Sequence, residues 1–361
     1  MASQWSLMFR KLIKHRLALV SAVVLGVLYL GAIFAGFLAP QGLEEYSGTY
    51  SNAPPSKLHL YHQGEYIGPF VYNYDISYDQ YENKIFTENT SVPYRIRFFV
   101  RGSSYKLLGL IKSDIHLYGV DNSALPEGKE PVSFLLFGAD RLGRDLYSRI
   151  LIGSQISLSV PLLGTGLTFI LALLIGGLSG YYGGVIDLVV QRIIEVLMSF
   201  PTLPLWMALS AAIPPGISVV KVYIYIVIIM SLIRWPGLAR IVRGKFLSLR
   251  NEDYITAARL IGVSDFMVVF KHLVPGFMSY LIVSLTLGIP GMIIGETAMS
   301  FLGLGMRPPA TSWGVLLQEA QRITSIMNQP WKLIPVLYVI VTVLGFNYLG
   351  DGLRDAADPY K

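Results

Sequence analysis

The chain has 361 residues, of which 53% are hydrophobic and only 14% are charged. Its mean hydropathy of +0.52 excludes an ordinary soluble protein of this length, so we expect an integral membrane protein. No cysteine is present, which excludes disulfides, thiolate nucleophiles and cysteine metal sites. The net charge of +6 is concentrated beside apolar runs, without a recognisable nucleic-acid-binding fold, so we expect no nucleic acid partner.

Residues 1–38 are predicted to form a cytoplasmic N-terminus and a first transmembrane helix. The run from Leu17 to Leu38 is uncharged. At ~1.5 Å per residue it extends about 33 Å, enough to cross a hydrocarbon core of ~30 Å. A signal peptide is the alternative, but its apolar region is only about 7 to 15 residues long, so we expect an uncleaved span. The residues that place its start in the cytoplasm by the positive-inside rule are Arg10, Lys11, Lys14, His15 and Arg16.

Residues 39–137 differ in composition and predict a small β-rich domain outside the cytoplasm. Tyrosine is interleaved there with Gly, Asn, Asp and Pro, and no helical stripe is evident. Partial alternation at 94–100 and an apolar stretch at 105–111 predict short strands. The tyrosines either pack the domain, which is the commoner role, or contact a carbohydrate or a binding protein. His59 and His62 have no acidic cluster nearby, so we expect no metal site.

Residues 138–158 form a charged amphipathic segment that leads into a span. Its charged side chains are of both signs and close enough to pair locally: Asp140, Arg141, Arg144, Asp145 and Arg149.

Further apolar runs predict spans at 156–179, 186–212, 219–235, 277–302 and 332–349. Glycines cluster around the turn between the first two of these spans. Small residues let helix backbones approach closely, which favours helix packing and a tight turn over a ligand role. These glycines are Gly176, Gly177, Gly180, Gly183 and Gly184.

Glu296 lies inside an apolar run. An ionisable group within a span costs about 2.5 to 3.5 kcal/mol on insertion scales. We therefore expect Glu296 to line the translocation pathway or tether a helix, and the alternative is hydration at the outer interface.

The polar stretch 251–275 separates two spans, and the arginines and lysines around it place it in the cytoplasm. It predicts two short helices, the first capped by Asn251 and ending with positive φ at Gly262, the second capped by Ser264 and closed by Pro275. An amphipathic helix of this kind fits either a groove on a partner or the membrane surface. Its predicted apolar stripe comprises Tyr254, Ile255, Ala258 and Ile261.

This stretch resembles the E-A-A-x-x-x-G signature, followed after nine residues by I-x-L-P, of the cytoplasmic loop in permease subunits of bacterial ABC importers. Thr256, His272 and Val274 depart from the pattern. In that family the loop is the coupling helix that docks into a separate ATPase. The resemblance assigns ATPase coupling to Asp253, Tyr254, Thr256, Ala257, Ala258, Gly262 and Pro275.

Residues 138–158 resemble a motif of the C-type permease of dipeptide and oligopeptide importers, G-T-D-x-L-G-R-D-x-x-S-R, with Ala139 in place of threonine. The segments ETAMSFLGLG and PPATSWG, at 296–305 and 308–314, resemble further motifs of these permeases. The outer-side family residues implied by the first motif are Asp140, Gly143, Arg144, Asp145 and Arg149.

The resemblance implies the type I ABC importer permease fold, an all-α integral membrane protein with six transmembrane helices, here with a β-rich extracytoplasmic insert. It divides the chain into 1–38, the insert at 39–137 and an importer core at 138–361 with the coupling loop 236–276. The implied partners are two ATP-binding cassette ATPase subunits, a second homologous permease subunit, an extracytoplasmic solute-binding protein and membrane lipid. The implied location is the bacterial cytoplasmic (inner) membrane, with both termini cytoplasmic.

No phosphate-binding loop, H-E-x-x-H or G-x-S-x-G motif occurs in the chain, so we expect a transport subunit that is not itself an enzyme. We expect no cofactor on this chain, with ATP and Mg on the partner subunits. The implied function is translocation of dipeptides and oligopeptides by alternating access. The alternatives are an importer of oligosaccharides or another small solute, and a membrane-anchored receptor or scaffold.

Overall fold

The computed structural model describes residues 4–80, 84–107, 109–123, 125 and 130–357. The chain forms two compact units, each assembled from segments that are distant in the sequence. Unit 1 contains Met1–Val27, Leu158–Met306 and Val339–Lys361. Unit 2 contains Leu28–Ser157 and Arg307–Tyr338.

Most of the fold is made of long apolar helices. Among the described residues, five helical segments are long and apolar enough to cross a membrane: α2 (Arg16–Ile33), α4 (Leu146–Tyr182), α7 (Val219–Leu249), α11 (Met278–Phe301) and Pro330–Ala357. The last joins the 3-10 helix η2 (Pro330–Leu333) to α14 (Ile334–Ala357). A sixth span results if α5 (Gly184–Ser199) and α6 (Thr202–Ala211), which meet at 88°, count as one broken span. This is the helical membrane fold that the sequence predicts.

The predicted stretches 156–179 and 219–235 lie within α4 and α7, which continue beyond them through less apolar turns. Backbone hydrogen bonds extend a helix whatever the hydropathy of its side chains, so an apolar window underestimates its length. The predicted stretch 186–212 corresponds to the α5–α6 pair, and its bend falls at Pro201, which cannot donate a backbone hydrogen bond.

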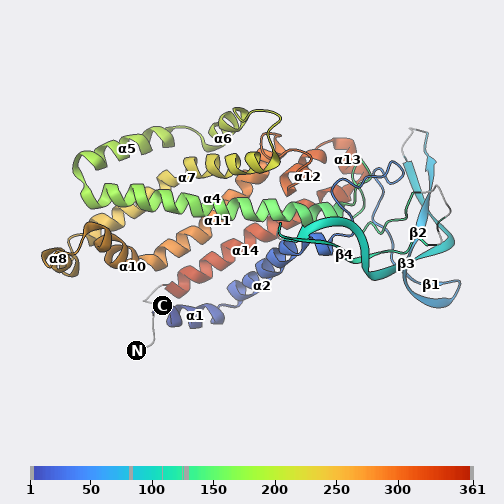
Figure 1. Ribbon diagram of the computed structural model, residues 1–361, viewed down its shortest axis with the longest axis horizontal. Helices are drawn as coiled ribbons and strands as arrows, with labels where there is room; N and C mark the ends of the chain where they lie inside the picture. The colour runs from blue at the N-terminus through green and yellow to red at the C-terminus, as the bar shows by residue number, and fades with distance from the viewer. Residues whose placement is uncertain (1–3, 81–83, 108, 124, 126–129, 358–361) are drawn as a thin grey trace. The chain divides into compact units, whose positions relative to one another are not determined.

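In unit 1, glycines of α4 let α7 approach its backbone, and Figure 1 shows the two helices side by side. A Cβ at Gly176 would lie 2.4 Å from the carbonyl oxygen of Ala239, and a Cβ at Gly180 would lie 2.7 Å from that of Arg243. Gly183 then turns the chain with φ +69°. The predicted role of this glycine cluster in helix packing and a tight turn is therefore confirmed.

Unit 2 contains a four-stranded antiparallel sheet in the order β1-β2-β3-β4 (Figure 1). The strands are β1 (His59–His62), β2 (Glu65–Tyr78), β3 (Lys84–Leu107) and β4 (Ile111–Val120). The β-rich insert predicted from the sequence is therefore present. The stretch 105–111, predicted as a strand of its own, is instead the end of β3 and the turn into β4, where Gly109 has φ +73°.

Two small apolar clusters hold the insert together. In one, Val71 and Tyr94 of the sheet pack with Val132. In the other, Tyr50 and Ala53 pack with Leu135 and Ala139. Tyr50 and Tyr94 are buried and have the predicted packing role. Other tyrosines of the insert are exposed: Tyr46, Tyr61, Tyr66 and Tyr78.

Shorter helices connect these elements. They are α1 (Gln4–Lys14), α3 (Ala35–Leu38), α12 (Trp313–Glu319) and α13 (Ile323–Asn328). In unit 2 the start of α12 is fixed by Ser312, whose hydroxyl accepts a hydrogen bond from the backbone N–H of Val315.

Candidate functional site

Asp140 organises the segment before α4 through both of its carboxylate oxygens. Its Oδ1 accepts hydrogen bonds from the backbone N–H groups of Leu142 at 2.7 Å and Arg144 at 3.0 Å, while Oδ2 accepts from Arg144 Nε at 2.6 Å. Gly143 completes this turn with φ +75°, and a Cβ there would lie 1.8 Å from the carbonyl oxygen of Ser47. Only glycine fits this position.

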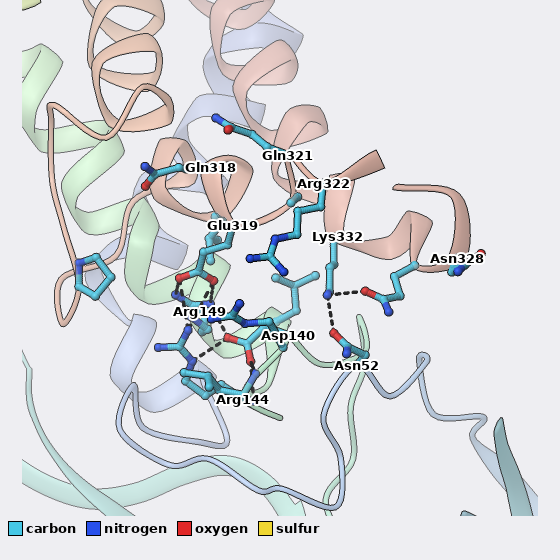
Figure 2. Close-up of a pocket in the computed structure, with 17 residues that line it drawn as sticks. Asn52, Asp140, Arg144, Arg149, Gln318, Glu319, Gln321, Arg322, Asn328 and Lys332 are labelled. Atoms are coloured by element: carbon cyan, nitrogen blue, oxygen red, sulfur yellow. Dashed lines mark hydrogen bonds and ion pairs between the residues drawn. The ribbon is translucent and has the colours of Figure 1, made fainter. Parts of the chain in front are cut away.

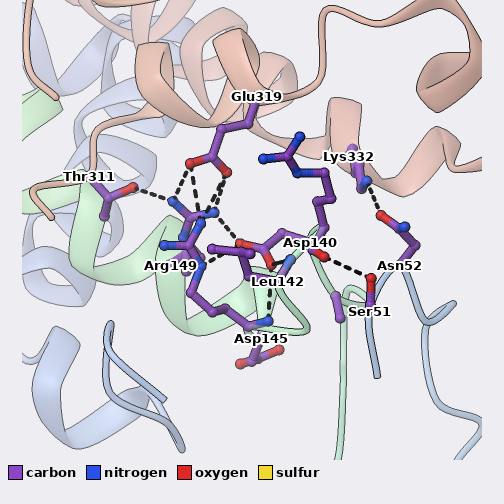
Figure 3. Close-up of polar contacts among 12 residues, drawn as sticks. Ser51, Asn52, Asp140, Leu142, Asp145, Arg149, Thr311, Glu319 and Lys332 are labelled. Carbon is purple, nitrogen blue, oxygen red and sulfur yellow. Dashed lines mark hydrogen bonds and ion pairs between the residues drawn. The ribbon is translucent and has the colours of Figure 1, made fainter. Parts of the chain in front are cut away.

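Four charged side chains form a closed ring in unit 2, which we call the charged ring: Asp140, Arg144, Arg149 and Glu319 (Figure 2). Arg149 binds Glu319 with both terminal nitrogens, one of them at 2.9 Å, and also donates to Asp140 (Figure 3). Arg144 reaches Glu319 at 3.3 Å. Because each carboxylate contacts both arginines, the charges balance within a largely buried cluster.

Asp145 lies outside the ring and caps α4. Its carboxylate accepts hydrogen bonds from the Ser148 backbone N–H at 2.9 Å, the Ser148 hydroxyl at 2.6 Å and the Tyr147 N–H at 3.3 Å. The two backbone N–H groups belong to the first turn of α4, where backbone N–H groups have no acceptor inside the helix. Burial raises the pKa of the Asp145 carboxyl to about 6, and the bonds from Ser148 oppose that rise.

This raised pKa predicts a specific pH dependence of stability. The folded state binds the Asp145 proton more tightly than an unfolded chain, in which the pKa has its ordinary value of 3.8. The contribution of Asp145 to the free energy of unfolding should therefore be largest below pH ~4 and be lost, by roughly 3 kcal/mol, as the pH rises through ~6. We expect Asp145→Asn to remove this slope from unfolding midpoints measured between pH 4 and 7. Asp114→Asn, at a half-exposed carboxylate, is the control that should keep the slope, and identical slopes for the two variants would contradict the assignment.

A cavity of about 720 Å³ opens beside the charged ring in unit 2 (Figure 2). Its charged lining consists of five cationic side chains and two carboxylates: Arg141, Arg144, Arg149, Arg322, Lys332, Asp140 and Glu319. The Lys332 ammonium donates to Asn52 Oδ1 at 2.6 Å and to Gln329. Within the described parts of the chain, neither Arg141 nor Arg322 forms an ion pair, so the lining carries a surplus of positive charge.

In unit 1, residues 251–276 fold into a helical unit that we call the coupling unit. It comprises α8 (Asp253–Leu260), a turn at Gly262 with φ +84°, and a helical run made of α9 (Asp265–Met267), the π-helix η1 (Val268–Leu273) and α10 (Val274–Gly276). The predicted helix, glycine and helix arrangement is present, with the predicted positive φ at Gly262.

The predicted ends of these helices are partly correct. The first helix ends at the Gly262 turn, and Ser264 precedes the first residue of α9, as predicted. Glu252, and not Asn251, precedes the first residue of α8, and neither Glu252 nor Ser264 makes a side-chain capping bond. Pro275 lies one residue before the end of the helical run at Gly276.

The predicted apolar stripe of α8 is divided between two faces. Ile255 and Ala258 are buried in a core with Phe246 and Phe277, whereas Ile261 is 80% exposed. The other residues assigned to ATPase coupling are all exposed: Asp253, Tyr254, Thr256, Ala257, Gly262 and Pro275. The exposed face also carries large apolar side chains, Leu260 and Phe266. The buried face packs the coupling unit against the rest of unit 1, and the exposed face makes no such packing contact.

Polar contacts fasten the coupling unit to the end of α4. The Tyr181 hydroxyl donates to Asp265 at 2.6 Å, and the Arg259 guanidinium lies 4.7 Å from the centre of the Tyr181 ring. Arg250 donates to the carbonyls of Gly180 and Tyr181, where the negative end of the α4 dipole attracts a cation. These contacts join α8 and α9 to a membrane-crossing helix.

Sequence reasoning missed several of these partners. Glu319 and Lys332 lie far along the chain from Asp140, and no periodicity relates them. Arg243 pairs with Asp187 through two bonds, which also joins distant segments. Arg243 lies among other cationic residues, Arg240 and Lys245, so its charge alone did not indicate this partner.

Glu296 is buried in α11, where its carboxylate accepts a hydrogen bond from the Ser300 hydroxyl at 2.8 Å. Ser300 in turn accepts from the Met306 backbone N–H at 3.1 Å. This geometry joins α11 to the loop that follows it, which favours the helix-tether role over hydration at an interface. In the described ranges, no group of three or more His, Asp or Glu residues could hold a metal ion.

The helices that are long and apolar enough to cross a membrane define an integral membrane protein. Residues 172–360 match the family described as binding-protein-dependent transport system inner membrane component. Residues 3–55 match the N-terminal transmembrane domain of oligopeptide transport permease C. The first match covers more than half of the residues of this chain, so the chain belongs to this family of inner membrane permeases.

Individual relatives agree with this assignment. The dipeptide transport system permease protein DppC of Bacillus subtilis is 38% identical over 62% of this chain and 68% of that protein. The oligopeptide transport system permease protein OppC of the same organism is 35% identical over 64% of this chain and 73% of that protein. The glutathione transport system permease protein GsiD of Pectobacterium atrosepticum is 39% identical over 66% of this chain and 76% of that protein.

Among solved structures, a chain of the MetNI methionine ABC transporter aligns over 58% of this chain and 96% of that chain, with 17% identity and a TM-score of 0.46.

Proposed function

We propose that this chain is the C-type permease of an ABC importer that carries short peptides across the inner membrane. Two ATP-binding cassette ATPase subunits, which bind ATP and Mg, drive the cycle, and a second homologous permease completes the pathway. A solute-binding protein delivers the cargo on the outer side, and both termini of this chain lie in the cytoplasm. In this arrangement the chain itself hydrolyses no ATP.

The coupling unit is the observation that carries the proposal. Leu260 and Ile261 are 83% and 80% exposed on a unit whose opposite face is buried in the chain's own core. Large apolar side chains exposed at the end of a helix fit a groove on a partner protein. A receptor or scaffold that is only anchored in the membrane has no use for such a unit.

The cargo is inferred from two further observations. The relatives described above are named for transport of dipeptides, oligopeptides and glutathione, all of which carry a carboxylate. The cavity beside the charged ring has a surplus of cations in its lining, and Arg322 extends into it (Figure 2). A cationic cavity attracts a carboxylate and gives a neutral oligosaccharide no comparable electrostatic advantage.

Purification of the chain from its native membrane tests the assembly. We expect ATPase subunits and a second permease to be recovered with it, and recovery of the chain alone would favour a scaffold. Uptake of a labelled dipeptide by the reconstituted complex tests the cargo. Unlabelled dipeptide should compete more strongly than its C-terminal amide, while competition by a neutral oligosaccharide in place of peptide would identify the alternative cargo.

A further inference from the structure

The hairpin formed by β3 and β4 is fastened to the end of the first span within unit 2 (Figure 1). The Tyr105 ring packs on Gly36 of α3, where a Cβ would lie 2.3 Å from the ring. Nδ1 of the buried His116 lies 2.5 Å from the carbonyl oxygen of Ala39. The apolar run of the first span ends at Leu38. These contacts therefore hold the hairpin at the level of the membrane surface.

Large apolar side chains of the hairpin lie exposed at this level. Leu110 is 83% exposed and Ile111 is 64% exposed, and Phe98 and Phe99 are also exposed. Leaving a leucine or isoleucine side chain in water forgoes about 1.5 to 3 kcal/mol of burial free energy. The Phe99 ring centroid lies 6.1 Å from that of Phe37 in α3, so the exposed apolar surface of the hairpin continues that of the span.

Two lysines flank this apolar tip. Lys106 and Lys112 are directly opposite each other in the register of β3 and β4, and both are exposed. Like charges at directly opposite positions repel each other and destabilise a strand pair. An anionic group held between the two ammonium groups would remove this repulsion. Apolar side chains beside lysines are also the composition of segments that lie in a membrane interface.

We propose that the β3–β4 hairpin lies in the membrane surface at which α3 ends and binds anionic phospholipid. Leu110 and Ile111 enter the boundary between headgroups and acyl chains, and the Lys106–Lys112 pair binds a lipid phosphate. The hairpin thereby fixes the insert to the bilayer. This proposal is independent of the cargo of the permease.

Site-directed spin labelling tests the proposal cleanly, because the chain contains no cysteine. A nitroxide is attached to Leu110→Cys in the full chain, in nanodiscs of phosphatidylcholine with or without phosphatidylglycerol. Its accessibility to oxygen, which concentrates in lipid, is compared with its accessibility to a nickel chelate, which stays in water. Leu30→Cys in α2 and Tyr66→Cys in β2 serve as lipid and water references, since both side chains are exposed. Ile111→Cys provides a second reporter.

We expect the oxygen-to-nickel ratio at Leu110→Cys and Ile111→Cys to lie near that of Leu30→Cys and to fall when phosphatidylglycerol is omitted. Added Lys106→Gln and Lys112→Gln changes should abolish this lipid dependence, whereas Lys57→Gln, at another exposed lysine, should not. A ratio equal to that of Tyr66→Cys would overturn the proposal. Protection from both reagents, seen only when the partner permease is present, would also overturn it and identify a protein as the occupant.

Discussion

Arg149→Met is expected to destabilise the protein by about 3–5 kcal/mol, the range for removing one partner of a buried ion pair. The Arg149 side chain is 3% exposed and donates to both carboxylates of the charged ring. Its loss leaves Asp140 and Glu319 facing a single cation, Arg144. The measurement is the midpoint of thermal unfolding of the purified protein in one detergent.

Two further variants show whether the charged ring causes this loss. Arg192→Met removes an exposed arginine that pairs with Glu195 within one helix, and should change stability by less than about 0.5 kcal/mol. Arg149→Met combined with Glu319→Leu should recover part of the loss, because Arg144 then balances Asp140 alone. An unfolding midpoint for Arg149→Met that equals that of Arg192→Met would show that the charged ring contributes little.

Leu260→Glu is expected to lower peptide uptake at least about tenfold while the amount of permease in the membrane stays unchanged. In the proposed complex Leu260 enters a groove of the ATPase, and truncating such an anchor costs roughly 2 kcal/mol or more, with a buried charge adding to that loss. The measurements are uptake by the reconstituted complex and the fraction of ATPase subunit recovered with the permease.

Matched variants separate coupling from folding. Leu58→Glu makes the same change at an exposed leucine of the insert and should leave both readouts unchanged. Ala258→Glu should instead reduce the amount of folded permease, because Ala258 is buried in the core of unit 1. If Leu260→Glu supports normal uptake, the exposed face of α8 is not where the ATPase binds.

The features that the sequence predicts well are those that depend on neighbouring residues. The spans follow from continuous apolar runs, and the φ of +84° at Gly262 follows from a glycine placed between two amphipathic segments. The pairing of Asp140 with Arg144 is also local, since the two residues are only four positions apart. In each case a short stretch of chain determines the geometry.

The features that the sequence could not predict depend on distant contacts. Glu319 meets Arg144 across 175 residues, so no spacing rule relates them. The stripe on α8 was mispredicted for a related reason. Periodicity identifies Ile255 and Ile261 as equally apolar, but only the position of Phe246 and Phe277 determines that Ile255 is buried and Ile261 exposed.

The 88° bend between α5 and α6 restricts what can surround this protein in the bilayer. At the end of α5 the helix stops and Pro201 offers no N–H, so the last carbonyl groups lack partners in a next helical turn, and the Ser199 hydroxyl donates to one of them, that of Val196. Hydrocarbon cannot satisfy such groups, so irregular backbone at membrane depth must be covered by protein or face water. If the pair crosses as one span, lipid cannot surround it on every side, and the break faces either a neighbouring subunit or a hydrated passage.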